Sequence, residues 1–173
     1  MMKKMFAVLL AALLTLTTAA LAATYADGEL AFEYDDAAFT ISANDVGDDE
    51  QLVILDFNGA AWGEGYVTIH LRETEDGETF PTKQDFADIE EALGVTVVQG
   101  DWANFKDVFS YTFDDEDGSV LGVFIAPVYD DGGELEDILT VNISVAPLED
   151  EAAGMARDDA ISALVDSLKV AED

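Results

Sequence analysis

The chain has 173 residues, of which 38 are acidic, seven are basic and none is cysteine. The formal net charge of −31 argues against nucleic acid and anionic membrane surfaces as partners, because proteins bind both through lysine and arginine side chains that neutralise phosphates. The lack of cysteine excludes disulfides, thiol catalysis and thiolate metal ligands.

The N-terminal segment has the pattern of a secretory signal peptide. Two lysines precede an apolar run at 6–16, and small residues follow as far as Ala22. The run is shorter than the roughly 20 residues that span a bilayer, which argues against a retained membrane anchor. We expect 1–22 to be a signal peptide cleaved after Ala22, with Ala23 and Ala26 as alternative sites, and the protein to be secreted or periplasmic.

The remainder has the length of one domain. We expect a flexible segment at 23–28 and a single domain at 29–173, which would bury roughly 68–70% of its unfolded surface. All 38 acidic residues and five of the seven basic residues lie beyond residue 23, so this part carries a net charge of −33. That charge favours solubility and a weak, non-specific attraction of cations or basic partners. Adaptation to high salt would leave the same acidic signature.

The first half of this domain predicts four strands. The run at 51–57 is almost continuously apolar, as expected of an interior strand covered on both faces. The run at 65–72 alternates apolar and polar residues, as a strand with one buried face does. The four predicted strands are 29–34, 38–42, 51–57 and 65–72.

A helix is predicted at 82–93, where the period of the apolar pattern changes. Thr82 and Asp85 have nearly the spacing of a capping box, with aspartate in place of the usual glutamate. Gly94 then ends the helix. The apolar stripe consists of Phe86, Ile89 and Leu93.

The second half repeats this order, with strands first and a helix last. The terminal helix is predicted at 151–169, with Ile161, Leu164, Val165 and Leu168 as its apolar stripe. The predicted strands are 95–100, 104–113, 119–128 and 138–146.

These elements define the fold class. Because no helix separates consecutive strands, the sheet should be mainly antiparallel and connected by hairpins. Two amphipathic helices need an apolar surface, which the sheet supplies. The sequence therefore predicts an α+β fold, an α/β/α sandwich with about six to eight strands flanked by two helices.

The order of elements also resembles a known family. With an acidic helix in mid-chain and the helix "ISALVDSLKV" after the strand "ILTVNISVAP", residues 29 to 170 are similar to the PsbP-like superfamily. That superfamily includes the extrinsic photosystem II protein, a fungal Ran-binding nucleotide-release factor and secreted bacterial proteins of unassigned function. The resemblance implies a non-catalytic binding or assembly role, and it assigns no functional residue to this chain.

Two acidic loops, 114–119 and 130–137, invite comparison with calcium loops. An EF-hand loop needs oxygen ligands at positions 1, 3 and 5, glycine at 6 and glutamate at 12. Placing Gly118 at position 6 puts Phe113 at position 1 and Phe124 at position 12, and the second loop fails similarly. We therefore predict two hairpin turns, no metal site and no cofactor.

No catalytic constellation emerges from the other polar residues. The single histidine, His70, lies on the polar face of an alternating strand and is expected to face solvent. The acceptor pattern for glycosylation at 142–144 falls in mid-strand and is discounted. Paired carboxylates could serve a glycosidase, but with 38 acidic residues no pair stands out.

Trp62 is the one candidate ligand-binding residue, because small, turn-forming residues surround it in "NGAAWGEGY". A tryptophan on a loop can contact a partner or a sugar ring, although it can equally fold back over the sheet. Trp102 is expected in the core, as are the aromatic residues of the strands. These strand residues are Phe105, Phe109, Tyr111, Phe113 and Phe124.

Two functional hypotheses follow. The first is a secreted, non-catalytic binding or assembly module whose ligand is an unknown protein or polymer. The alternative is a secreted hydrolase that uses paired acidic residues. The scarcity of histidine, cysteine and lysine favours the first, because few groups can then titrate near neutral pH.

Overall fold

Within the described residues 22–58, 63–114 and 118–171 of the computed structural model, the strands form two antiparallel sheets. The smaller sheet has the order β1-β2-β10 and consists of Ala22–Asp27, Leu30–Asp35 and Lys169–Val170. The larger sheet has the order β3-β4-β5-β9-β8-β7-β6. Its strands are β3 (Phe39–Val46), β4 (Glu50–Phe57), β5 (Gly65–Glu73), β6 (Val98–Trp102), β7 (Phe105–Asp114), β8 (Val120–Tyr129) and β9 (Leu135–Val145).

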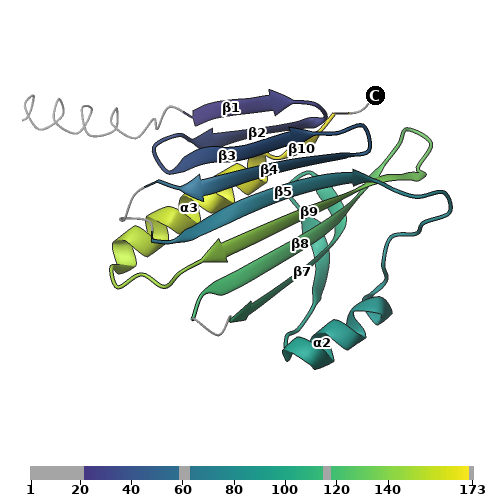
Figure 1. The fold of residues 1–173 in the computed structure, drawn as a ribbon. Helices are drawn as coiled ribbons and strands as arrows, with labels where there is room; N and C mark the ends of the chain where they lie inside the picture. The colour runs from purple at the N-terminus through teal and green to yellow at the C-terminus, as the bar shows by residue number, and fades with distance from the viewer. Residues whose placement is uncertain (1–21, 59–62, 115–117, 172–173) are drawn as a thin grey trace, which may run out of the picture.

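Two helical segments flank the larger sheet. A 3-10 turn, η2 (Lys83–Phe86), leads into α2 (Ala87–Leu93), and α3 (Glu151–Ser167) follows β9. In Figure 1, α3 lies behind the sheet and α2 lies beside its β7 end. The predicted α+β class, a mainly antiparallel sheet flanked by two helices, is confirmed. None of the helices in the described part of the chain is long and apolar enough to cross a membrane.

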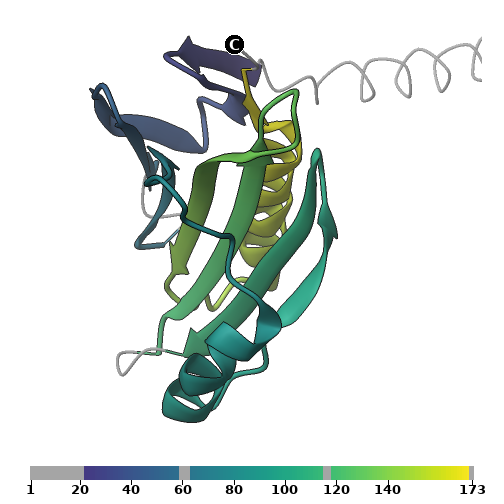
Figure 2. The same cartoon turned by 90° about the vertical axis from the view of Figure 1, so that its right-hand side faces the viewer.

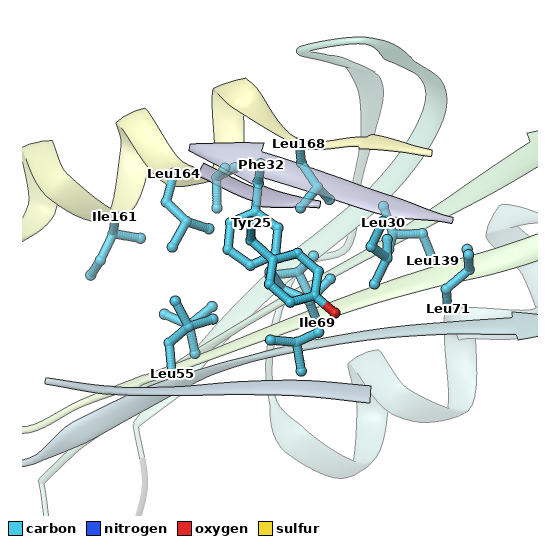
Figure 3. Packing of buried hydrophobic residues seen from close by; sticks show 14 of the residues in the cluster. Tyr25, Leu30, Phe32, Leu55, Ile69, Leu71, Leu139, Ile161, Leu164 and Leu168 are labelled. Carbon is cyan, nitrogen blue, oxygen red and sulfur yellow. The ribbon is translucent and has the colours of Figure 1, made fainter. Parts of the chain in front are cut away.

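The main core fills the space between the larger sheet on one side and α3 with the smaller sheet on the other. Figure 3 shows Tyr25 and Phe32 of the smaller sheet, and Leu164 of α3, facing Leu55 and Ile69 of β4 and β5. The alternation predicted for 65–72 supplies this face, since Val67, Ile69 and Leu71 are all buried. Burying one such side chain stabilises the fold by roughly 1.5–3 kcal/mol.

A second, smaller core covers the other face of the sheet at its β7 edge. Phe109 of β7 packs against Phe86 of η2, with ring centroids 4.5 Å apart, and against Phe80, at 5.7 Å. Its neighbour in the same strand, Val108, points to the main core instead. Successive residues of β7 therefore serve opposite faces, and the two helices cover opposite sides of the sheet. Figure 2 shows α3 running along one face of the sheet and α2 lying beside the lower end of β7.

The start of the mid-chain helix follows its predicted cap. The carboxylate of Asp85 accepts hydrogen bonds from the backbone N–H and the hydroxyl of Thr82, both at 2.7 Å. The backbone bond is the larger cause that lowers the pKa of Asp85. Of the predicted apolar stripe, Phe86 is buried and Ile89 packs against the same cluster, whereas Leu93, the last residue of α2, is 46% exposed.

The N-terminal segment differs from its prediction. Residues 22–27 form β1, paired along its whole length with β2, where a flexible segment was expected at 23–28. Only one large apolar side chain, Tyr25, signals this strand, and its ring is buried by stacking on Phe32 at 4.7 Å. The burial of Tyr25 thus depends on its pairing with β2, and a single apolar residue is too weak a pattern to predict that pairing from the sequence.

The C-terminal helix ends two residues before its prediction. Its stripe is confirmed, because Ile161, Leu164, Val165 and Leu168 are all buried. Leu168 itself has extended backbone, with φ −61° and ψ 135°, so the chain leaves the helix there and adds β10 to the edge of β2. The last described residues of the chain consequently lie against β2, near the beginning of the fold (Figure 1).

Candidate functional site

Strands β7 and β8 separate near one end of the larger sheet. They pair from Asp114 opposite Val120 as far as Phe109 opposite Ile125. Beyond that point β8 continues through Ala126–Tyr129 in register with β9 alone among the described strands. The edge of β8 that faces away from β9 is therefore unpaired over its last four residues.

A local distortion turns β7 away. Asp107 has a left-handed backbone, with φ +56°, and its N–H lies 3.3 Å from a carboxylate oxygen of Asp101 across the β6–β7 hairpin. Aspartate tolerates this conformation better than most residues do. Near the start of β7, Phe105 and Val108 pair with β6 and pack on the main core, and neither pairs with β8.

The space between the separated strands is a groove of about 630 Å³, which we call the β8 groove. This volume lies within the usual range of ligand sites, roughly 300–1,000 Å³. Its walls come from the start of β7, the end of β8 with the turn that follows, and the C-terminal β10. The lining residues are Asn104, Phe105, Lys106, Pro127, Val128, Tyr129, Asp130, Asp131, Glu136, Lys169, Val170 and Ala171.

Backbone-directed hydrogen bonds hold the groove open. The side-chain amide of Asn104 donates to the carbonyl of Leu168 at 2.9 Å, which ties the β6–β7 turn to the end of α3. The N–H of Ala171 donates to the carbonyl of Glu29 at 2.7 Å, and β10 pairs with β2. Hydrogen bonds within the protein thus fix two of the three walls, the start of β7 and β10, without a ligand. Ligand sites in proteins are usually pre-formed in this way.

The groove gathers two of the five basic residues beyond residue 23, Lys106 and Lys169. Both side chains are exposed, and neither forms an ion pair with a described residue. The two arginines already have partners. Nη1 and Nη2 of Arg72 donate to the carboxylate of Glu78, and the buried Arg157 donates to a backbone carbonyl. The remaining cation, Lys83, is exposed on η2 and lies outside the groove.

The groove also offers apolar and acidic contacts. The ring of Tyr129 is 46% exposed at its mouth, and Pro127 and Phe105 are buried beneath the surface. Asp130 and Asp131 come from the β8–β9 turn. An exposed tyrosine beside separate positive and negative groups can bind a ligand that carries both charges and an apolar part.

An acidic cleft of about 260 Å³ adjoins the groove and shares Glu136 with it. Its carboxylates come from the β1–β2 turn, the β3–β4 hairpin and the ends of β5 and β9. Among the described residues, no group of acidic or histidine side chains is arranged to hold a metal ion. The carboxylates of the cleft are Glu29, Asp48, Asp49, Glu50, Glu73, Glu136 and Asp137, of which only Asp137 is buried.

The two acidic loops behave as connections between strands. In the second loop, Asp130 and Glu134 close the turn with reciprocal backbone and side-chain hydrogen bonds, and Gly133 has a left-handed φ of +82°. This confirms the hairpin predicted there. In the first loop, Asp114 and Val120 face each other across the β7–β8 ladder, and residues 115–117 lie outside the described part.

The residues singled out in the sequence do not meet at the groove. Trp62 lies outside the described residues. His70 is half-buried rather than fully solvent-facing, and its Nε2 lies 3.0 Å from a carboxylate oxygen of Glu50 on the neighbouring strand. Trp102 packs on the core as predicted, with its ring stacked on Phe124 at 4.4 Å. Asn142 donates to Thr68 within the sheet, in agreement with its mid-strand position.

Sequence reasoning missed Lys106, Lys169 and Tyr129. The rarity of lysine could have drawn attention to the first two, and Pro127 inside a strand pattern could have indicated an unpaired edge. Only the fold brings them together. No family model, curated protein or solved structure is significantly similar to this chain.

Proposed function

We propose that this chain is an exported binding or assembly module whose ligand occupies the β8 groove. One observation carries the proposal: the open edge of β8 and two lysines that form no ion pair with a described residue line the same groove. The rest of the protein is overwhelmingly negative in charge. The groove has the volume of a ligand site, and hydrogen bonds fix its walls in advance. The predicted signal peptide and the resemblance to PsbP-like binding proteins agree with this role and remain proposals.

The alternative, a hydrolase with paired carboxylates, would use the adjoining acidic cleft. Six of the seven carboxylates there are exposed. A carboxyl group that works as a general acid usually needs an apolar surrounding that keeps it protonated at neutral pH. The groove therefore supports a binding function better than the cleft supports catalysis.

The proposal is tested with purified protein that begins at Ala23, screened on arrays of peptides and of glycans. A charge-reversed variant, Lys106→Glu with Lys169→Glu, should lose at least tenfold in affinity for the ligands that bind the unchanged protein. The matched control is Lys83→Glu, which makes the same change at an exposed lysine outside the groove and should bind normally. Thermal melting confirms that each variant is folded.

Two results would contradict the proposal. One is the absence of binding to both arrays. The other is a ligand that binds the doubly reversed variant as tightly as it binds the unchanged protein.

A further inference from the structure

We propose that the β8 groove receives an extended peptide of a partner protein, which adds as a strand to the free edge of β8 and directs an acidic side chain at Lys106 and Lys169. This inference rests on the proposed function and names the class of its ligand. The same peptide is expected to carry basic residues beside that acidic one.

The first argument is the strand edge. Over Ala126–Tyr129, β8 pairs with β9 on one side, and no described strand pairs with it on the other. An unpaired edge presents backbone donors and acceptors to any extended chain that reaches it. Of these four residues, Pro127, Val128 and Tyr129 line the groove, and three residues of strand measure about 10 Å at roughly 3.3 Å per residue, the length over which a short peptide can pair along the edge.

Pro127 supports the same reading. A proline has no N–H to donate, so within an antiparallel sheet it is tolerated where the missing donor faces an unpaired side. Pro127 lies opposite Ile138 of β9, in the middle of the open stretch.

The second argument is charge. Lys106 and Lys169 come from different walls, β7 and β10, and neither pairs with a described carboxylate. A carboxylate placed between them would form charge-assisted hydrogen bonds, which are stronger than neutral ones. The nearby Asp130 and Asp131, together with the net charge of −31, would repel a wholly acidic peptide and attract basic flanking residues.

The same charge argues against a second copy of this chain as the occupant. Two molecules that each carry about thirty negative charges repel each other strongly at moderate ionic strength. A partner with basic residues around the inserted strand meets no such barrier.

The experiment selects peptides from a random seven-residue library displayed on phage, using the protein that begins at Ala23. We expect the selected peptides to share one acidic position with basic residues beside it. The best peptide is then synthesised with single N-methyl groups at successive backbone amides. Because alternate N–H groups of a strand point to the same side, methylation should weaken binding at least tenfold at every second position and little at the positions between.

The variants test the charge argument. Lys106→Glu with Lys169→Glu should change the preference at the shared acidic position of the selected peptides to a basic residue, whereas Lys83→Glu should leave that preference unchanged. The N-methyl series needs no variant of the protein, so a folding defect cannot obscure that result.

Several outcomes would overturn the inference. A methylation series without alternation excludes strand addition, and glycan binding without peptide binding excludes a peptide ligand; both leave the proposed function intact if the doubly reversed variant loses binding. If sedimentation shows that the unchanged protein is a dimer and that the doubly reversed variant is a monomer, the occupant of the β8 groove is a second copy of this chain. Failure of both peptides and glycans to bind refutes the inference and the proposed function together.

Discussion

The side-chain amide of Gln51 on β4 donates a hydrogen bond to the hydroxyl of Tyr25 on β1, at 2.8 Å, and so joins the two sheets. Gln51 is only 4% exposed. It also donates to the carbonyl of Asp27 at 2.7 Å and accepts from the N–H groups of Glu29 and Leu30 at 3.1 and 3.3 Å. One side-chain amide therefore forms hydrogen bonds with three backbone groups of the β1–β2 turn. That turn forms part of the acidic cleft beside the groove.

Removing this amide should destabilise the protein. Gln51→Leu leaves the two N–H groups and the carbonyl of the turn without their partner, which should lower the free energy of unfolding by about 1–3 kcal/mol. Tyr25→Phe should cost about 1 kcal/mol, and the double variant should cost less than the sum because the two groups contact each other. Urea unfolding measures all three.

The control for these variants is Thr24→Ala, a change at an exposed position of the same strand. It should alter the stability by less than about 0.5 kcal/mol. Additive losses for Gln51→Leu and Tyr25→Phe would show that the hydrogen bond between them does not couple the sheets.

The β1–β2 turn requires glycine for a second reason. A Cβ atom on Gly28 would lie 2.6 Å from Oε1 of Gln51, and the residue has a left-handed φ of +55°. Gly77 has a similar φ of +83° but no atom within 4 Å of the corresponding position. Gly28→Ala should therefore raise the urea sensitivity more than Gly77→Ala, which measures the backbone strain alone. Equal effects would mean that Gln51 moves aside without cost.

The place of β1 in the fold predicts where the mature chain begins. Protein that starts at Ala23 or Thr24 keeps Tyr25, whereas protein that starts at Asp27 loses its buried ring and most of the pairing with β2. Losing a buried aromatic side chain costs about 3–5 kcal/mol. We expect the protein that starts at Asp27 to melt well below the other two. N-terminal sequencing of exported protein should find Ala23 or Thr24.

An intact Met1 in the exported pool would contradict the signal-peptide prediction. Equal melting temperatures for the three starting points would show instead that β1 contributes little to stability.

The sequence predicts buried faces that follow from a repeat within one segment, and it does not predict contacts between residues far apart in the chain. Periodicity within one segment predicted the buried faces, as at Val67 and Ile69 of β5 and at Leu164 of α3, because each stripe repeats several times. Tyr25 forms no repeat: its ring is buried against Phe32 of the next strand, and its hydroxyl accepts a hydrogen bond from Gln51, 26 residues away. No local pattern can reveal such a contact.

The groove was beyond prediction for the same reason. Lys106 and Lys169 line one groove because α3 returns the chain to the smaller sheet, where β10 pairs with β2. The left-handed backbone of Asp107 lies close to the point where β7 and β8 cease to pair, although its neighbours in the sequence have the pattern of an ordinary strand. Trp62, the one site residue the sequence suggested, lies outside the described residues.

An ion pair in the β5–α2 connection predicts a pH dependence. The guanidinium of Arg72 donates to both carboxylate oxygens of Glu78, at 3.0 and 2.6 Å, and this lowers the pKa of Glu78 from 4.5 to about 2. A carboxyl group with a lowered pKa in the folded state stabilises the fold above its unfolded pKa and loses that contribution as the pH falls through the folded one.

Glu78→Gln should therefore be less stable than the unchanged protein at pH 7. The difference should persist down to about pH 4.5, shrink between pH 4.5 and 2, and vanish below, as measured by urea unfolding at each pH. Glu91→Gln, a change at an exposed carboxylate of α2, serves as the control and should show no such window. A difference that stays constant with pH would mean that Glu78 acts through packing instead of charge.

The net charge predicts how stability responds to salt. With a charge of −33 beyond residue 23, many carboxylates lie within one Debye length of each other, about 10 Å at 0.1 M salt. Their repulsion opposes the folded state more than the extended chain, and screening weakens it. The melting temperature should therefore rise as sodium chloride increases from about 10 mM to about 500 mM, a range over which the Debye length falls from about 30 Å to a few Å.

The acidic cleft allows a sharper version of this test. Asp48→Asn with Asp49→Asn removes two exposed charges of the β3–β4 hairpin from the acidic cleft, which seven carboxylates and no lysine or arginine line. This variant should melt higher than the unchanged protein at low salt and respond less to added chloride, because part of the repulsion is gone. If instead the melting temperature falls with salt, or the variant is the less stable protein, the carboxylates are compensated in the fold. A specific cation held by the cleft would then be the better explanation of the acidity.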